Sequence, residues 1–182
     1  MLQNYLNARP IIAERVYIHE LSAVIGEVTI SEDCSIWPGA VVRGDVNTIS
    51  IGKRTNIQDQ SVLHVTHKSK MNPNGFPLLV GSDVTIGHRV TCHGCQIADR
   101  VLLRIGSIIL DGAYIPGDVI IGAHSLVPAN KVLQSGYLYY GSPVQKIRPL
   151  TQQELEFLPY SAAHYVALKN HYLNNDPVVA EN

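Results

Sequence analysis

Three histidines of this chain, His64, His88 and His93, have spacings that could serve metal chemistry. Three neutral imidazoles that leave a fourth position open are typical of a catalytic zinc site. Zinc lowers the pKa of its bound water towards about 7, so that hydroxide is available at neutral pH. The other interpretation is that these are ordinary surface histidines in a chain that has eight. Spacing alone leaves both interpretations open.

Large apolar residues recur every six positions, and this repeat is what would position the histidines. A helix needs apolar spacings of three and four, and a hairpin strand needs a spacing of two. A period of six predicts an all-β solenoid, a parallel β-helix whose triangular coil takes six residues on each side. Most of the large residues are followed four positions later by a small or β-branched residue, such as Val16, Cys34, Val46 or Ser61. The large residues are Ile12, Ile18, Val24, Ile30, Ile36 and Val42, then Ile51, Ile57 and Leu63, then Val80, Ile86 and Cys92, then Ile97, Leu103, Ile109, Ile115, Ile121 and Val127.

The place of each histidine in its hexad predicts where its side chain points. His64 and His93 both follow the large apolar residue, so they would stack on equivalent sides of adjacent coils. His88 is the third residue of its hexad and would point from another side, roughly 120° around the axis. One prism therefore cannot easily bring all three to one ion. A neighbouring copy in a three-fold assembly could supply the missing imidazole.

The chain divides into a repeat and a C-terminal part. Residues 1–135 are predicted to form the β-helix, with a loop insertion at about 66–78. Residues 136–182 are predicted to form an irregular connector and a C-terminal α-helix packed on the prism. Thr151 and Glu154 have the form of a capping box at the start of this helix, and Pro159 is expected to kink or interrupt it. Residues 176–182 are expected to form a frayed tail.

The composition favours a soluble oligomer. Because the 14 basic and 15 acidic residues nearly balance, neither a nucleic-acid face nor a polybasic membrane patch is expected. No apolar run approaches the ~20 residues of a membrane span, and no secretory signal is visible at the start. Three cysteines cannot form a complete disulfide framework. We expect a cytoplasmic protein, and a charged fraction of only 16% suggests that an oligomer hides part of its surface.

Several segments together resemble the γ-class carbonic anhydrase family, in its compact bacterial branch. They are Ile36–Asp45, Ile51–Asp59, Leu63–His67, Val84–His88, His93–Cys95 and Gly141–Pro143. The resemblance implies a left-handed β-helix, a homotrimer and a zinc ion at each subunit interface, with Fe²⁺ or Co²⁺ as other possible metals. It also implies that His64 and His93 bind the metal from one chain and His88 from its neighbour.

The resemblance assigns roles to residues around the metal as well. Gln58 and Asn56 would hydrogen-bond the metal-bound water or bicarbonate. Gln58 shares the hexad phase of His64, so these two side chains are expected to point to one region. Tyr165 would lie near the metal, from the C-terminal helix. The alternatives are solvated polar groups for the amides and a packing aromatic for the tyrosine. An ion-pair cluster across the trimer interface would be formed by Arg43, Asp45 and Asp59.

The chain departs from the family pattern in three places. Val46 stands where the best-studied type has a glutamate, and the loop from Thr66 to Pro77 contains no acidic residue that could carry protons. Bulk buffer or a histidine such as His67 would have to serve instead. Arg104 occupies a hexad position where the family commonly has glycine, and the sequence gives no functional account of it.

These observations leave three hypotheses about function. The first is zinc-dependent, reversible hydration of CO₂ to bicarbonate by a metal-bound hydroxide, which is a lyase activity. The second is an acyl-CoA transferase or thioesterase of the hexapeptide-repeat type, in which a histidine between subunits acts as a base. The third is a metal-binding trimer without catalytic activity. Metal content and CO₂ hydration would separate them.

Overall fold

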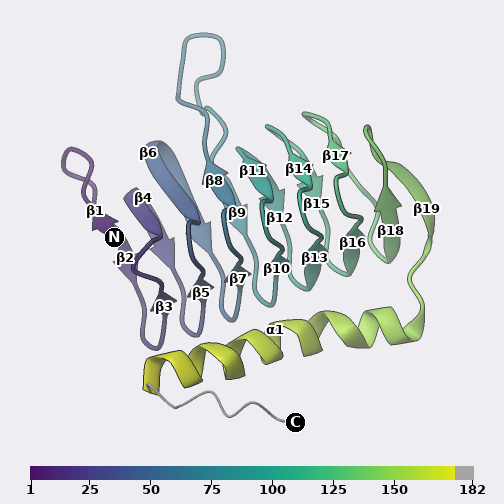
Figure 1. Cartoon of the computed structure of the whole chain (residues 1–182). Coiled ribbons are helices and arrows are strands. Elements are labelled where there is room, and N and C mark those ends of the chain that lie inside the picture. Colours follow the sequence, from purple (N-terminus) through teal and green to yellow (C-terminus); the bar gives the residue numbers. More distant parts are fainter. Residues whose placement is uncertain (175–182) are drawn as a thin grey trace.

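A computed structural model describes residues 1–174, and it shows a left-handed parallel β-helix with one long helix along its side (Figure 1). The helix is α1 (Gln152–Asn174). The expected tail at 176–182 lies outside the described residues. The strands are β1 (Leu2–Gln3), β2 (Ile11–Ile12), β3 (Tyr17–Ile18), β4 (Ala23–Ile30), β5 (Ser35–Ile36), β6 (Val41–Ile51), β7 (Asn56–Ile57), β8 (Val62–His64), β9 (Leu78–Val80), β10 (Thr85–Ile86), β11 (Thr91–His93), β12 (Gln96–Ile97), β13 (Val101–Leu103), β14 (Ile108–Ile109), β15 (Tyr114–Ile115), β16 (Val119–Ile121), β17 (Leu126–Val127), β18 (Tyr137–Tyr140) and β19 (Gln145–Pro149).

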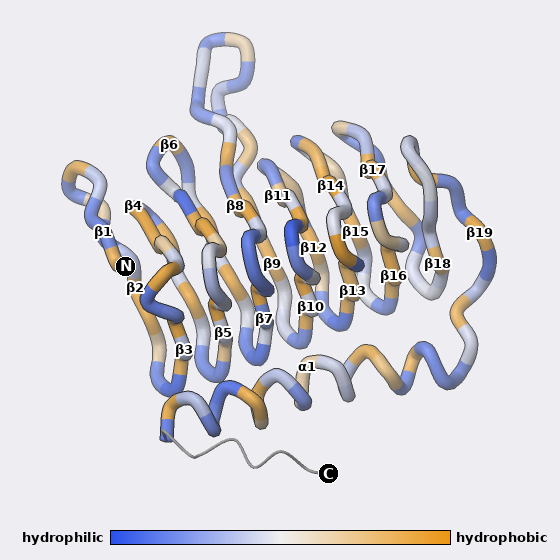
Figure 2. Tube along the Cα trace, viewed as in Figure 1, coloured by the Kyte–Doolittle hydropathy of each residue, from blue (hydrophilic) through white to orange (hydrophobic). Residues whose placement is uncertain are grey.

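Each strand pairs with the strand one coil before it and one coil after it. One face of the prism is a sheet in the order β19-β18-β16-β13-β10-β7-β5-β3. The other two faces are joined into one sheet because β6 runs without a break from one to the other. Hydrophobic residues line the strands, and hydrophilic residues gather at the corners (Figure 2). The hexad residues from Ile30 onward fill the axis and are buried. The fold predicted from the period of six is therefore confirmed.

The corners of the coil are turned by residues in the left-handed backbone region, and few of them are glycine. Positive φ angles of 54–60° occur one residue before the small hexad residue, for instance at Asp33, Arg54 and Asp83. This region costs about 1–2 kcal/mol for an ordinary residue. On one corner the side chains of these residues pair across coils. The pairs are Arg15–Asp33, Arg54–Asp83 and Arg100–Asp118, each with two hydrogen bonds of 2.6–3.1 Å.

Two local expectations are wrong. Val46 is 41% exposed, because the chain bulges out between Asp45 and Thr48 and the buried position passes to Ile49. The segment expected to be an irregular connector forms β18, which pairs in parallel with β16, and β19, which pairs antiparallel with β18. The loop between β8 and β9 projects from the prism (Figure 1).

The C-terminal helix begins at the expected capping box. The backbone N–H of Glu154 donates to Thr151 Oγ1 at 3.2 Å, and the N–H of Thr151 donates to Glu154 Oε2 at 2.9 Å. The helix then continues through Pro159, where an interruption was expected. Leu158 and Ala162 are buried on either side of the proline. Packing against the prism therefore offsets the lost backbone hydrogen bond, which typically costs about 3 kcal/mol.

The helix is tied to the prism by one buried charge. The ammonium of Lys169 is fully buried and lies 3.1 Å from Asp33 Oδ1 at the ladder corner, while donating to Asn170 Oδ1 at 2.6 Å. The helix contacts β3, β5 and β10, so it covers one face and leaves the others open. Among residues 1–174, no helix is long and apolar enough to cross a membrane.

Candidate metal centre

His64 and His93 lie directly over one another on adjacent coils, as their hexad phase predicted. They are register partners in β8 and β11. Nδ1 of His64 and Nε2 of His93 are 3.0 Å apart, and the ring centroids are 5.0 Å apart. Two nitrogens bound to one tetrahedral zinc at about 2.0–2.1 Å would be about 3.3 Å apart. The pair is therefore arranged as two ligands of one ion would be.

A carboxylate holds the opposite nitrogen of each ring. Nε2 of His64 is 3.1 Å from Asp45 Oδ1, and Nδ1 of His93 is 2.8 Å from Asp111 Oδ1. Such pairs fix the tautomer and the ring orientation of a metal-binding histidine. Here they direct each N–H to an aspartate, so that the two nitrogens facing one another are the ones free to bind metal.

The charge states of His64 and Asp45 suit metal binding. Burial, the largest influence, lowers the pKa of His64 despite the neighbouring Asp45, so the ring is neutral at neutral pH. Burial acts to raise the pKa of Asp45, but hydrogen bonds from Arg43 and His64 outweigh it, and that pKa is lowered. Neutral imidazoles beside ionised carboxylates are what a divalent ion requires.

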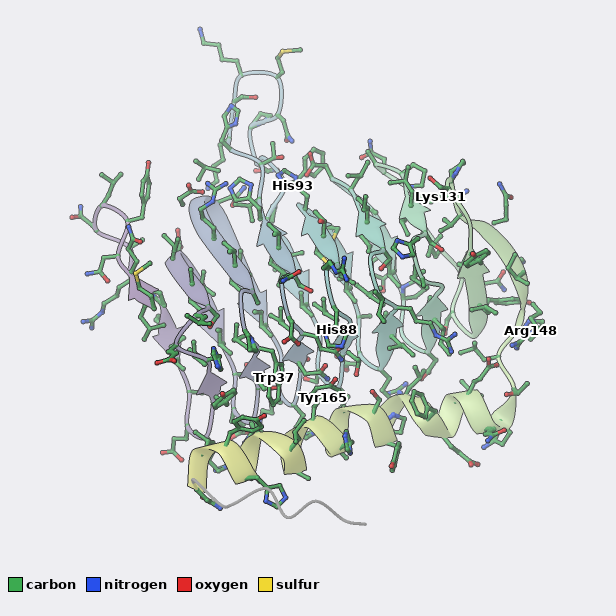
Figure 3. All side chains as sticks on the ribbon, viewed as in Figure 1. Trp37, His88, His93, Lys131, Arg148 and Tyr165 are labelled. Carbon is green, nitrogen blue, oxygen red and sulfur yellow. The ribbon has the colours of Figure 1, made fainter. Side chains whose placement is uncertain are left out.

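His88 lies on a different side of the prism, as expected (Figure 3). It follows β10 in the sheet that α1 covers, whereas the other two histidines belong to β8 and β11. It too is held by a carboxylate, since Nδ1 is 2.9 Å from Asp59 Oδ2. Within residues 1–174 of one chain, no three histidine, cysteine or acidic side chains come together to hold a metal. One chain therefore holds its three histidines in two separate groups, called half-sites below: His64 with His93, and His88.

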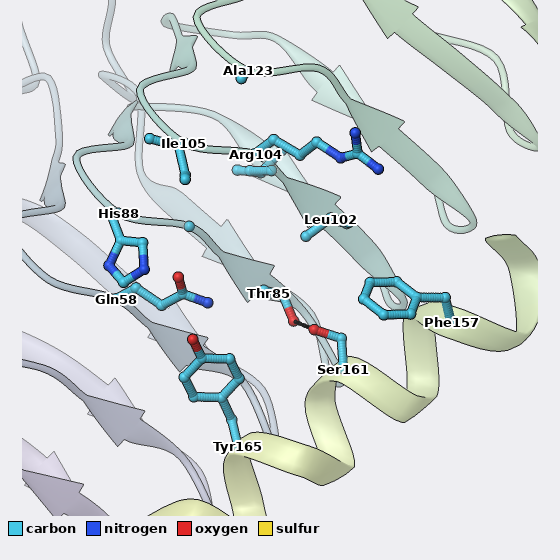
Figure 4. Close-up of a pocket in the computed structure, with 12 residues that line it drawn as sticks. Gln58, Thr85, His88, Leu102, Arg104, Ile105, Ala123, Phe157, Ser161 and Tyr165 are labelled. Atoms are coloured by element: carbon cyan, nitrogen blue, oxygen red, sulfur yellow. Dashed lines mark hydrogen bonds between the residues drawn. The ribbon is translucent and has the colours of Figure 1, made fainter.

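Gln58 belongs to the half-site of His88 and not, as expected, to the region of His64. It follows β7, which pairs with the β10 strand that precedes His88, and both side chains line one pocket (Figure 4). Residues at the same hexad position on different faces point in different directions. The hexad position of Gln58 alone does not say which face this residue lies on.

Asn56 links Gln58 to the C-terminal helix. The side-chain amide of Gln58 donates to Asn56 Oδ1 at 3.1 Å, and that of Asn56 donates to Thr85 Oγ1 at 3.0 Å. The Thr85 hydroxyl is 2.9 Å from Ser161 Oγ on α1. Both amides are buried, and this chain of bonds fixes the orientation of the Gln58 side chain.

Tyr165 brings a hydroxyl to the same pocket, where it points toward Gln58 (Figure 4). Its ring packs edge-on against Trp37, with centroids 5.7 Å apart. Burial and then the charge of Asp59 raise the pKa of Tyr165. The hydroxyl therefore keeps its proton at neutral pH and can donate a hydrogen bond.

The predicted ion-pair cluster is divided between the two half-sites. Arg43 pairs with Asp45. Asp59 pairs with His88 instead, so within one chain the three residues do not meet. His67 is exposed in the loop after β8.

Asp111 is a site residue that the sequence analysis missed. Besides His93, it accepts a hydrogen bond from Thr66 Oγ1 at 3.0 Å, which ties the start of the loop to the site. It lies one coil beyond Gly94, the residue that follows His93, because Thr91 and Cys92 are in register with Ile108 and Ile109, a step of 17 residues. Counting one coil from the residues next to each histidine would have found it.

Comparison with known proteins identifies the family. No protein-family model matches the chain. The mitochondrial gamma carbonic anhydrase 1 of Arabidopsis thaliana is 38% identical over 164 residues, which is 90% of this chain and 59% of that protein. A carbonic anhydrase of Geobacillus kaustophilus is 37% identical over 172 residues, 94% of this chain and 91% of that protein. The chain belongs to the γ-class carbonic anhydrase-like family.

Three further proteins are similar to this chain in sequence or structure. Protein YrdA of Escherichia coli is 56% identical over 174 residues, 96% of this chain and 95% of that protein. A hexapeptide transferase family protein from Anaplasma phagocytophilum superimposes with a TM-score of 0.88 at 34% identity, covering 94% of this chain and 98% of its own. A putative acetyltransferase from Bacillus cereus superimposes with a TM-score of 0.88 at 38% identity, covering 94% of this chain and 96% of its own.

Proposed function

We propose that this protein catalyses the reversible hydration of CO₂ to bicarbonate at a metal ion held between the subunits of a homotrimer. The observation that carries the proposal is the His64–His93 pair, 3.0 Å apart, with the outer nitrogen of each ring held by an aspartate. Family members named as carbonic anhydrases support the choice of reaction.

The proposed ligands are Nδ1 of His64 and Nε2 of His93 from one chain, with Nε2 of His88 from a neighbouring chain. These are the nitrogens that no aspartate holds. Three imidazoles suit Zn²⁺, and they also accept Fe²⁺ or Co²⁺. When bound, such an ion supplies Lewis acidity that brings the pKa of a water near 7 and polarises substrate oxygens.

An open apolar face supports the assembly of subunits. The outward side chains of the face that carries His64 and His93 are in register from coil to coil and are small, apolar or β-branched. Two of them, Val62 and Ile108, are each 40% exposed, and α1 lies on a different face. A second copy placed here would bury this stripe and could bring its own His88 to the pair. The stripe consists of Ala23, Val41, Val62, Thr91, Ile108 and Leu126.

Gln58 and Tyr165 would position the substrate beside the metal. The side-chain oxygen of Gln58 can accept a hydrogen bond from a hydroxyl group of the substrate, because the bond to Asn56 uses the amide nitrogen. The Tyr165 hydroxyl can donate to a bicarbonate oxygen. No acidic residue lies in the loop between Thr66 and Pro77. Buffer, or the exposed His67, would therefore carry the released proton.

The test is metal content and CO₂ hydration measured on the same preparations. We expect protein purified with and without oxygen to carry close to one transition metal per chain and to hydrate CO₂ in stopped-flow assays. His93→Ala should lose both, whereas His164→Ala, which changes an exposed helix histidine, should lose neither. Metal-free protein under both conditions would refute the proposal. Full metal content with thioester hydrolysis and no CO₂ hydration would favour the acyl-transfer alternative.

A further inference from the structure

We propose that the pocket beside His88 binds an organic monocarboxylate with an apolar body, and that Arg104 pairs with its acid group. The proposal concerns this chain's own residues and does not depend on CO₂ hydration. It also gives a role to the arginine that departs from the family pattern.

The pocket is mostly apolar. Its volume is about 320 Å³, which is at the lower end of small-molecule sites. It lies between the β7–β10–β13 face and α1, and one end is polar, with His88, Gln58 and Tyr165 (Figure 4). The remaining wall is largely hydrocarbon, contributed by Leu102, Leu103, Ile105, Ala123 and Phe157.

Arg104 is the only lysine, arginine, aspartate or glutamate among the twelve residues that line this pocket. Its side chain extends along the wall, and the guanidinium lies on the side of Phe157, away from His88 (Figure 4). Among residues 1–174, its side chain forms no ion pair or hydrogen bond with a protein group. By contrast, five other arginines are paired with carboxylates, namely Arg15, Arg43, Arg54, Arg100 and Arg148.

An unpaired guanidinium over an apolar wall specifies a ligand with two parts. A planar carboxylate matches the fork of donors on arginine and can take two parallel hydrogen bonds. Ile105 and Phe157, which are 46% and 44% exposed, would then be covered by a hydrocarbon segment of the ligand. Bicarbonate has no such segment, so it would leave this wall in water. A short-chain fatty acid satisfies both the cation and the wall.

Hexanoate is the probe, and 1-hexanol is its uncharged counterpart. Binding is measured by titration calorimetry on metal-free and metal-loaded protein. We expect hexanoate to bind both forms, and Arg104→Gln to weaken binding about tenfold or more. Arg104→Lys should restore part of the loss, and Phe157→Ala should weaken hexanoate and 1-hexanol alike.

Arg89→Gln is the matched control, because Arg89 is also an arginine without a carboxylate partner among the described residues but does not line the pocket. It should leave hexanoate binding unchanged. Equal affinity of Arg104→Gln and the parent protein, or no binding by the parent, would overturn this inference. Because the titration uses metal-free protein, Arg104-dependent binding without CO₂ hydration would refute only the proposed function.

Discussion

Each of the three histidines is paired with an aspartate, and the pairing decides which ring nitrogen is available. Asp45, Asp59 and Asp111 occupy one nitrogen of His64, His88 and His93, respectively. These contacts exist within one chain, before any second copy or metal is added. The three imidazole rings would therefore lose little orientational freedom on binding the proposed ion.

Asp111→Asn should weaken metal binding about 10–100-fold, because an amide holds the His93 ring less firmly and lowers the basicity of its other nitrogen. Competition with a chromogenic chelator measures the affinity. Thr66→Val is the control, since it removes the other partner of Asp111 and leaves the His93 contact in place. Equal affinities for Asp111→Asn and Thr66→Val would show that Asp111 does not support the site.

At this scale the sequence predicted some contacts and not others. The stacking of His64 on His93 followed from hexad phase alone. Asp111 escaped notice because side chains one coil apart are 17 or more residues apart in sequence, and only the register of the coils relates them. Gln58 was assigned to the wrong region because phase gives the position on a side but not which side.

The corners of the β-helix are formed largely by non-glycine residues in the left-handed backbone conformation. Arginine and aspartate alternate along one corner from Arg15 to Asp118, and each arginine pairs with the aspartate of the next coil. The axis residues were predictable because their period is strict. The corner conformation was not, because glycine and asparagine are the usual signals for positive φ and few of them stand there.

Ser107→Ala should raise the free energy of unfolding by about 1 kcal/mol, since its buried hydroxyl has no partner among the described residues. Ser61 occupies the equivalent hexad position but donates to Gly87 O at 2.8 Å and accepts from the Val90 N–H at 3.1 Å. Ser61→Ala should therefore lower the same free energy by about 1–2 kcal/mol. Denaturant unfolding at a fixed protein concentration measures the free energy of unfolding of both variants. Changes of the same sign would contradict the assignment of the Ser107 hydroxyl as unpaired.

The ion pair between Asp33 and Lys169 should make the attachment of α1 sensitive to acid. Arg15, and then Lys169 against opposing burial, lower the pKa of Asp33 to about 2. A folded-state pKa below the ordinary 3.8 gives stability that is present above about pH 4 and is lost as the pH falls towards about 2. Far-ultraviolet circular dichroism during acid titration follows the loss.

Asp33→Asn should remove this acid-sensitive part and lower the free energy of unfolding by about 3 kcal/mol at neutral pH, because it leaves the buried Lys169 ammonium without its carboxylate. Asp118→Asn is the control. It changes the same type of corner residue at the same backbone conformation, but its partner Arg100 is exposed. Asp118→Asn should lower the free energy of unfolding by less than about 1 kcal/mol. Equal losses in the two variants would show that Lys169 does not depend on Asp33.

For the whole molecule, the two half-sites predict complementation between damaged subunits. His64→Ala and His88→Ala should each fail to bind metal as homotrimers. Refolded together in equal amounts, they should regain about a quarter of the sites, because one interface of each mixed ring combines two intact halves. His64→Ala mixed with His93→Ala should regain none, since both changes damage the same half. The metal content per chain, measured after gel filtration, is the readout. No recovery in the first mixture would rule out the shared site.

The antiparallel strand β19 has a consequence for growth of the solenoid. Every other pairing along its face is parallel, so a bare final coil would offer a template on which another chain could stack indefinitely. β19 reverses direction on that coil and presents Lys146, Arg148 and Pro149 outward. A charged strand that ends in proline is a poor template for further pairing. The β18–β19 hairpin thus limits the solenoid to a fixed length, whereas continued parallel pairing could extend this fold into a fibre.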